Sequence, residues 1–265
     1  MKRIDRMFAE CRAQQRRALI VFVSVGDPSL KFTRKLVPAL IDSGADLVEF
    51  GVPFSDPMAD GPTIQAASER ALKSGVNLPQ IMDLIGNLRV DFPRTPFVLF
   101  SYYNLILQYG VERLAADSAE RGVDGWLVVD LPPEEDQEVR PALARHGLAK
   151  IPLLAPNTPP ERWPLILEQA QGFVYYITVT GVTGARTKLP ADLARQLSRI
   201  RTGSPVPVAA GFGVSTAQQA RTVGEHADGV IVGSRLINVM QEAGTQKKAM
   251  AAACRLVREL AAALR

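Results

Sequence analysis

Residues 47–65 read LVEFGVPFSDPMADGPTIQ, a short apolar segment followed by a proline-rich loop. Because side chains alternate across a β-strand, Glu49 is expected to share one face with Leu47 and Gly51. Prolines at three positions of the loop fix backbone φ angles around Asp60. The stretch therefore predicts a strand that carries one carboxylate and a stiff loop that carries a second. Two such groups in apolar surroundings are typical of an acid/base site.

The rest of the chain repeats the pattern of an apolar strand followed by a helix. Segments rich in Val, Ile and Phe occupy residues 18–25, 46–52, 97–102, 125–130, 150–154, 173–178, 206–211 and 228–233. Strands that alternate with helices form right-handed βαβ units, and eight such units close most naturally into a single (β/α)8 TIM barrel of the α/β class. An open doubly wound sheet is the alternative, although no GxGxxG follows the first strand.

Two additions to the eight units are expected. Ile4, Met7, Phe8 and Cys11 recur at helical spacing, which predicts an extra N-terminal helix that packs under the barrel. The second unit is longer than the others and has room for an insertion, an additional helix near residues 63–74. No linker-like composition interrupts the chain, so residues 1–265 are expected to form one TIM-barrel catalytic domain.

The composition limits the class of protein. The chain has 265 residues, 47% of them hydrophobic, and no apolar run long enough to span a membrane, which predicts a soluble protein. Only Cys11 and Cys254 are present, far apart, which favours a reducing, cytoplasmic setting. The net charge of +4 is spread along the chain. Nucleic-acid binding stays an alternative, but a weak positive field suits an anionic small substrate equally well.

Three consecutive strand-to-helix junctions near the C-terminus are rich in glycine. They are Gly181-Val-Thr-Gly184, Gly211-Phe212-Gly213 and Gly233-Ser234. Glycines let backbone N–H groups approach an anion closely, and a helix that begins at Ser234 would offer the positive end of its dipole. These loops are where barrels commonly hold phosphate, so the sequence predicts a phosphate site.

Other chemistries have less support in the sequence. A Schiff-base mechanism needs a lysine that projects into the barrel, and no lysine is expected at the C-terminal end of a strand. His146 and His226 are expected at helix ends on the opposite face, so no metal site is expected. Apolar and aromatic side chains near strand ends outline a flat aromatic slot, although each one alone could be ordinary barrel packing: Phe22, Phe100, Tyr102, Leu127, Tyr175 and Phe212.

The chain resembles the α subunit of tryptophan synthase over nearly its whole length. Five segments carry the resemblance in order: FGVPFSDPMADGPTIQ at 50–65, SYYN at 101–104, TGVTGAR at 180–186, AGFGVS at 210–215 and IVGS at 231–234. The resemblance implies a lyase of tryptophan biosynthesis that cleaves indole-3-glycerol phosphate to indole and glyceraldehyde 3-phosphate. It implies no cofactor in this chain, which agrees with the absence of a candidate lysine or metal cluster.

The resemblance also implies roles for individual residues. Glu49 is similar in position to the acid/base that serves indole C3 and the glycerol hydroxyl, and Asp60 to the group that holds the indole N–H. Tyr175 is similar in position to a catalytic residue that assists these two carboxylates. Thr183 and Gly184 match the lid over the substrate, while Gly213, Gly233 and Ser234 match the phosphate nest.

A protein partner is implied as well, the pyridoxal-phosphate-containing β subunit of an α2β2 heterotetramer. Pro53, Asp56, Asn104 and Pro132 match positions that face it. Two alternatives stay open: a stand-alone lyase that releases indole without a partner, and a non-catalytic barrel that activates one. The presence of both Glu49 and Asp60 favours catalysis over the last of these.

Overall fold

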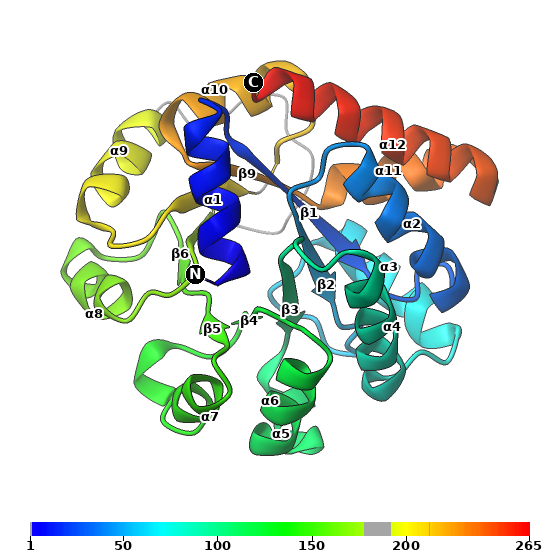
Figure 1. Ribbon diagram of the computed structural model, residues 1–265, viewed down its shortest axis with the longest axis horizontal. Coiled ribbons are helices and arrows are strands. Elements are labelled where there is room, and N and C mark those ends of the chain that lie inside the picture. Colours follow the sequence, from blue (N-terminus) through cyan, green and yellow to red (C-terminus); the bar gives the residue numbers. More distant parts are fainter. Residues whose placement is uncertain (1, 178–191, 212) are drawn as a thin grey trace.

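The computed structural model describes residues 2–177, 192–211 and 213–265. Parallel strands line the centre and helices surround them (Figure 1). The strands are β1 (Ala18–Ser24), β2 (Leu47–Gly51), β3 (Phe97–Ser101), β4 (Gly125–Val128), β5 (Ala149–Lys150), β6 (Leu153–Leu154), β7 (Val174–Ile177), β8 (Val208–Gly211) and β9 (Gly229–Val232). Their order in the sheet is β5-β4-β3-β2-β1-β9-β8-β7-β6. The expected TIM-barrel class is confirmed.

The barrel closes at a seam in the fifth expected strand. That strand is not continuous over residues 150–154 but consists of β5 and β6, each two residues long. On one side Ile151 N–H donates to the Trp126 carbonyl at 2.9 Å, and on the other Tyr175 N–H donates to the Pro152 carbonyl at 2.9 Å. Pro152 has no N–H and cannot continue a ladder, so the chain changes partner here.

Helices cover the outside of the strands (Figure 1). They are α1 (Arg3–Ala13), α2 (Leu30–Asp42), α3 (Pro62–Lys73), α4 (Leu78–Asp91), α5 (Tyr103–Tyr109), α6 (Val111–Glu120), α7 (Val139–Arg145), α8 (Trp163–Glu168), α9 (Leu193–Gly203), α10 (Ala217–His226), α11 (Ser234–Glu242) and α12 (Gln246–Ala263), with short 3-10 turns at Pro133–Glu135 and Pro160–Arg162. Both α3 and α4 lie between β2 and β3, which confirms the insertion beside Asp60. No helix in the described ranges is long and apolar enough to cross a bilayer.

Two hydrophobic cores result from the alternation of side chains along the strands. In β1, Ile20 and Phe22 belong to the inner core, whereas Leu19, Val21 and Val23 pack outward against the helices. The buried face of α1 closes the inner core, with the ring of Phe8 at 5.8 Å from that of Phe173. The N-terminal helix therefore plugs the end of the barrel at which the strands begin, as expected.

Three aspartates stabilise the end of the barrel at which the strands begin. Each directly precedes a strand, accepts a hydrogen bond from the first or second residue of the neighbouring strand, and forms an ion pair with an arginine. The backbone donors are Leu19 to Asp46 at 2.8 Å, Phe97 to Asp124 at 2.9 Å and Val208 to Asp228 at 2.9 Å. The arginines are Arg16, Arg89 and Arg201 in the same order, and Arg3 of α1 joins Asp124. These bonds set the register between strands and tie α1 to the barrel.

Candidate active site

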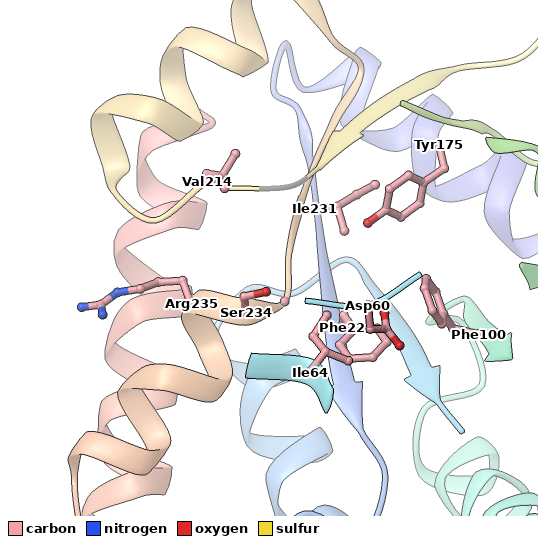
Figure 2. A pocket seen from close by; sticks show the side chains of 11 residues that line it. Phe22, Asp60, Ile64, Phe100, Tyr175, Val214, Ile231, Ser234 and Arg235 are labelled. Carbon is pink, nitrogen blue, oxygen red and sulfur yellow. The ribbon is translucent and has the colours of Figure 1, made fainter. Parts of the chain in front are cut away.

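A cavity opens at the other end of the barrel, where the strands end (Figure 2). The space between its walls amounts to about 490 Å³, including the part open to solvent. Residues that line it come from β1, the β2–α3 loop, α3, β3, β7, the β8–α10 loop, β9 and the start of α11: Phe22, Asp60, Ile64, Phe100, Tyr175, Gly213, Val214, Ile231, Gly233, Ser234 and Arg235. Carboxylate, phenol and backbone N–H groups thus share one mostly apolar cavity.

Glu49 is buried beside this cavity on the inner face of β2. Its Cα lies in register with Phe22 of β1 and Val98 of β3, and the residue is 0% exposed. Among the described residues, neither carboxyl oxygen has a hydrogen-bond partner. Burial alone raises the pKa of Glu49 to about 8, because the ionised form has neither water nor a counter-ion to stabilise it. At neutral pH this group is therefore mostly a protonated acid.

Asp60 faces the cavity from the loop before α3. The Tyr102 hydroxyl donates to its Oδ2 at 3.0 Å, and the N–H of Ala59 donates to that same hydroxyl at 3.1 Å. Burial raises the pKa of Asp60 to about 6, and the bond from Tyr102 limits the rise. Near neutral pH, Asp60 is therefore mostly ionised while Glu49 is mostly protonated. Such separated pKa values are typical of acid/base assignments in active sites.

Tyr175 turns its hydroxyl toward the cavity (Figure 2). Burial raises its pKa well above the usual value, and the nearby charges of Glu49 and Asp60 add to the effect. Gly211 makes room for this hydroxyl, because a Cβ there would lie 3.0 Å from it. Tyr175 is therefore a neutral phenol close to both carboxyl groups.

Two glycines position the ring of Phe22. A Cβ on Gly51 would lie 2.3 Å from that ring, and a Cβ on Gly233 would lie 3.2 Å from the Phe22 Cβ. The ring meets Phe100 edge-on, with centroids 5.0 Å apart. The absence of side chains at these two positions thus allows a pair of aromatic rings to form one wall.

Backbone N–H groups at the start of α11 form the opposite part of the cavity. Gly233 precedes the helix and Ser234 begins it, while Gly213, with φ of 87°, approaches from the β8–α10 loop. The first N–H groups of a helix have no partner within it and attract anions. Arg235 points away from the cavity (Figure 2) and pairs with Glu242 at 3.4 Å. This end can hold a phosphate.

Arg70 connects the two helices that carry these groups. From α3 it donates to Asp27 after β1 through Nε at 2.8 Å and a terminal nitrogen at 2.7 Å. In the orientation that satisfies both groups, the side-chain amide oxygen of Gln241 in α11 accepts from the same guanidinium. The helix that follows Asp60 and the helix that begins at Ser234 are therefore fixed relative to each other.

The expected site residues fall into three groups in the structure. Those in the cavity lining are Phe22, Asp60, Phe100, Tyr175, Gly213, Gly233 and Ser234. Those beside it but outside its lining are Glu49, Tyr102, Leu127 and Gly211; Tyr102 holds Asp60, and Leu127 is packed in the inner core. Thr183, Gly184 and Phe212 lie outside the described residues, so their expected contacts stay predictions.

Four residues that line the active-site cavity were not predicted from the sequence. Ile64, Val214, Ile231 and Arg235 line the cavity but were not among the expected site residues. The predicted site residues Asp60, Gly213 and Gly233 lie close to these four along the chain. They could have indicated them, because residues adjacent to a loop that binds a ligand often line the same cavity.

The expectation that no lysine ends a strand is wrong for Lys150, the last residue of β5. Ala149 faces the inner core, so the alternation turns Lys150 outward, where it pairs with Asp136. It does not enter the barrel and offers no amine to the cavity. Within residues 2–177, 192–211 and 213–265, no three His, Cys, Asp or Glu side chains gather in a way that could hold a metal ion.

Fold and cavity together place the chain in the class of (β/α)8-barrel enzymes. A family model described as "Tryptophan synthase alpha chain" matches residues 8–265. The chain therefore belongs to the tryptophan synthase alpha chain family.

Individual relatives agree with this assignment. A tryptophan synthase alpha chain from Geobacter sulfurreducens is 51% identical over 241 residues, which are 91% of each chain, and one from Laribacter hongkongensis is 46% identical over 93% of each. Among solved structures, tryptophan synthase subunit alpha from Legionella pneumophila str. Paris superposes with a TM-score of 0.92 at 39% identity, covering 100% of this chain and 98% of the other. A tryptophan synthase structure from Mycobacterium tuberculosis gives 0.91 at 37% identity, covering 100% and 98%.

Proposed function

We propose that residues 1–265 act as one catalytic domain that performs the alpha reaction of tryptophan synthase. This reaction is a retro-aldol cleavage of indole-3-glycerol phosphate to indole and glyceraldehyde 3-phosphate. One observation carries the assignment of roles. A protonated acid, Glu49, is buried beside a cavity that an ionised carboxylate, Asp60, lines together with Gly233 and Ser234 at the start of α11.

The substrate would place its phosphate at the start of α11 and its flat ring against Phe22 and Phe100. In this pose Asp60 accepts the indole N–H and stabilises the positive charge that develops on the ring. Glu49 gives its proton to C3, and the ring becomes an iminium that can accept electrons. The resulting Glu49 carboxylate then takes the proton of the glycerol hydroxyl, the carbon–carbon bond breaks, and the electron pair restores indole. Glu49 ends protonated, as it began, so the step needs no outside proton.

Tyr175 is proposed to assist without changing its charge. Its raised pKa keeps the phenol protonated at any ordinary pH, so it can donate a hydrogen bond but does not supply a base. The purified chain should release indole from indole-3-glycerol phosphate, measured as free indole. The absence of indole, both from the chain alone and with a β subunit added, would contradict the proposed function.

We further propose that the rim of this end of the barrel docks a tryptophan synthase β subunit. Asp56 and Pro132 are exposed in the loops after β2 and β4, and Asn104 is exposed in the first turn of α5 after β3; these are three neighbouring strands, and Pro53 in the loop after β2 is buried. Pyridoxal phosphate is expected in that partner, and the complex in the cytoplasm. Addition of a β subunit should raise the rate of indole formation, and sedimentation should detect a complex.

A further inference from the structure

Arg235 lies in the first turn of α11, directly after the two residues that form the proposed phosphate end of the active-site cavity. It belongs to the lining of this cavity together with Gly233 and Ser234. Its guanidinium turns away from the cavity (Figure 2) and pairs at 3.4 Å with Glu242, the last residue of the same helix. The proposed reaction leaves this positive charge without a role.

The phosphate end needs more positive charge than backbone groups supply. A phosphate monoester carries about 1.5 to 2 negative charges at neutral pH, whereas the start of a helix is equivalent to about half a positive charge. Asp60, which is mostly ionised near neutral pH, adds a like charge to the same cavity. Among the described residues of the lining, Arg235 is the only cation. It is therefore the described side chain that can balance the phosphate.

The ion pair with Glu242 holds Arg235 only weakly. Both members lie at unfavourable ends of α11, because a helix dipole favours anions at its start and cations at its end. The side chain of Arg235 is 33% exposed and that of Glu242 is 64% exposed, and ion pairs open to solvent contribute little to stability. A dianion at the start of α11 would make the position of Arg235 favourable. The guanidinium can therefore exchange Glu242 for a phosphate.

The direction of side chains on a helix allows this exchange. Side chains lean toward the N-terminus of their helix, so an arginine in the first turn can extend past Ser234 to the space in front of it. A planar guanidinium can then donate two parallel N–H bonds to phosphate oxygens, which is a geometry that phosphate binding favours.

We propose that Arg235 is a further substrate-binding residue, whose guanidinium leaves Glu242 and binds the phosphate of the substrate. Backbone N–H groups at Gly233 and Ser234 hold the phosphate from one side, and the guanidinium contacts it from another. Glu242 is the competing partner that holds Arg235 while the site is empty. The inference rests on the proposed function for the identity of the substrate, but binding of a simple phosphate monoester tests it without turnover.

Glycerol 3-phosphate is the probe, since it has the phosphate but no indole ring, and isothermal titration calorimetry measures its Kd for the full chain. Arg235→Gln should raise this Kd about tenfold, because it removes the positive charge and the paired donors of the guanidinium. Arg235→Lys keeps the charge but not the planar pair of donors, and should raise Kd about threefold. Arg255→Gln, which removes an exposed charge of α12, is the matched control and should change Kd by less than about twofold.

Glu242→Gln tests the exchange itself. It frees Arg235 from its partner, so glycerol 3-phosphate should bind about twofold more tightly. The same change made in the Arg235→Gln variant should have no effect, because no competition is left to remove. An equal gain in both backgrounds would contradict the exchange.

Kinetics distinguish this inference from the proposed lyase function. In the reverse condensation, Arg235→Gln should raise KM for glyceraldehyde 3-phosphate about tenfold and leave both KM for indole and kcat within about twofold. If no condensation occurs but glycerol 3-phosphate binding still depends on Arg235, the lyase function alone is contradicted. The role of Arg235 is overturned if Arg235→Gln binds glycerol 3-phosphate as well as the unmodified chain does, if Arg255→Gln weakens binding equally, or if the unmodified chain does not bind it.

Discussion

Buried carboxylates lie at both ends of this barrel, but their surroundings are opposite. At the end where strands begin, Asp124 accepts from Arg3, Arg89 and the Phe97 N–H at 2.9–3.0 Å. At the other end, Glu49 accepts from none of the described residues. A fully paired carboxylate contributes to stability, whereas an unpaired one destabilises the fold and retains its proton. The comparison separates an end that holds the barrel together from an end equipped for proton transfer.

Asp124→Asn should produce the largest loss of stability. It leaves the largely buried Arg89 side chain without its counter-ion, and breaking a buried pair costs about 3–5 kcal/mol. Chemical denaturation should show this loss, while kcat per folded molecule stays within about twofold. Asp228→Asn is the matched control; its partner Arg201 is more exposed than Arg89, so the loss should be smaller. If Asp124→Asn lowers kcat as well, the two ends do not have separate roles.

Glu49→Gln should have the opposite profile. Removal of the acid that protonates C3 is expected to lower kcat at least about 10²-fold. The free energy of unfolding should be unchanged or higher, since a neutral amide replaces a group that is costly to ionise. Steady-state assays of indole release and denaturation of the same preparation test both parts. Near-normal turnover would remove Glu49 from the mechanism.

The pH dependence of stability should report the buried acid directly. The folded-state pKa of Glu49 is about 8, above the ordinary value of 4.5 for this side chain, so the folded protein binds more protons than the unfolded chain between these values. Its contribution is fully present below pH 4.5 and is lost as pH rises to 8, at about 1.4 kcal/mol per pH unit. The difference in stability between the unmodified chain and Glu49→Gln, followed across this window, isolates the effect. A constant difference would mean that Glu49 titrates normally.

Tyr102→Phe should shift the pH profile of kcat/KM, a smaller effect than those expected for the preceding variants. Loss of the hydroxyl that donates to Asp60 raises the pKa of that carboxyl above about 6, so the acidic limb of kcat/KM should move upward by about half to one unit. Tyr103→Phe, at the next position in the chain, is the control. An unmoved limb would show that another group sets it.

Arg70→Lys should have the smallest effect. Lysine cannot make the two-pronged bond to Asp27 and also reach Gln241, so the spacing between Asp60 and Ser234 should loosen. We expect KM to rise about threefold with little change in kcat. Arg94→Lys, whose exposed partner Glu10 lies at the far end of the barrel, should leave both unchanged. An equal rise in the two variants would contradict a positioning role for Arg70.

Local patterns in the sequence were sufficient for most of the fold. Alternation in residues 47–51 placed Glu49 on the inner face, helical spacing from Ile4 to Cys11 predicted the plug, and glycines at 213 and 233 marked two loops that meet at the cavity. Each of these signals lies within a few residues along the chain, which is why it could be read without coordinates.

Features that depend on contacts between distant segments could not be read in this way. Ile64 and Ile231 share a cavity only because the barrel curves, and the link from Asp27 through Arg70 to Gln241 spans three elements. The division of the fifth strand did leave a signal, since Pro152 lies inside the apolar run and a proline argues against a continuous central strand.

The order of the strands has a consequence for synthesis of the chain. β1 emerges first from the ribosome, yet one of its two neighbours in the sheet is β9, which is made last. All seven residues of β1 are buried in the finished protein, so this apolar edge stays open on one side until residue 232 has been translated. Such an edge can pair with other chains, so the nascent protein should need shielding by a chaperone throughout most of its translation.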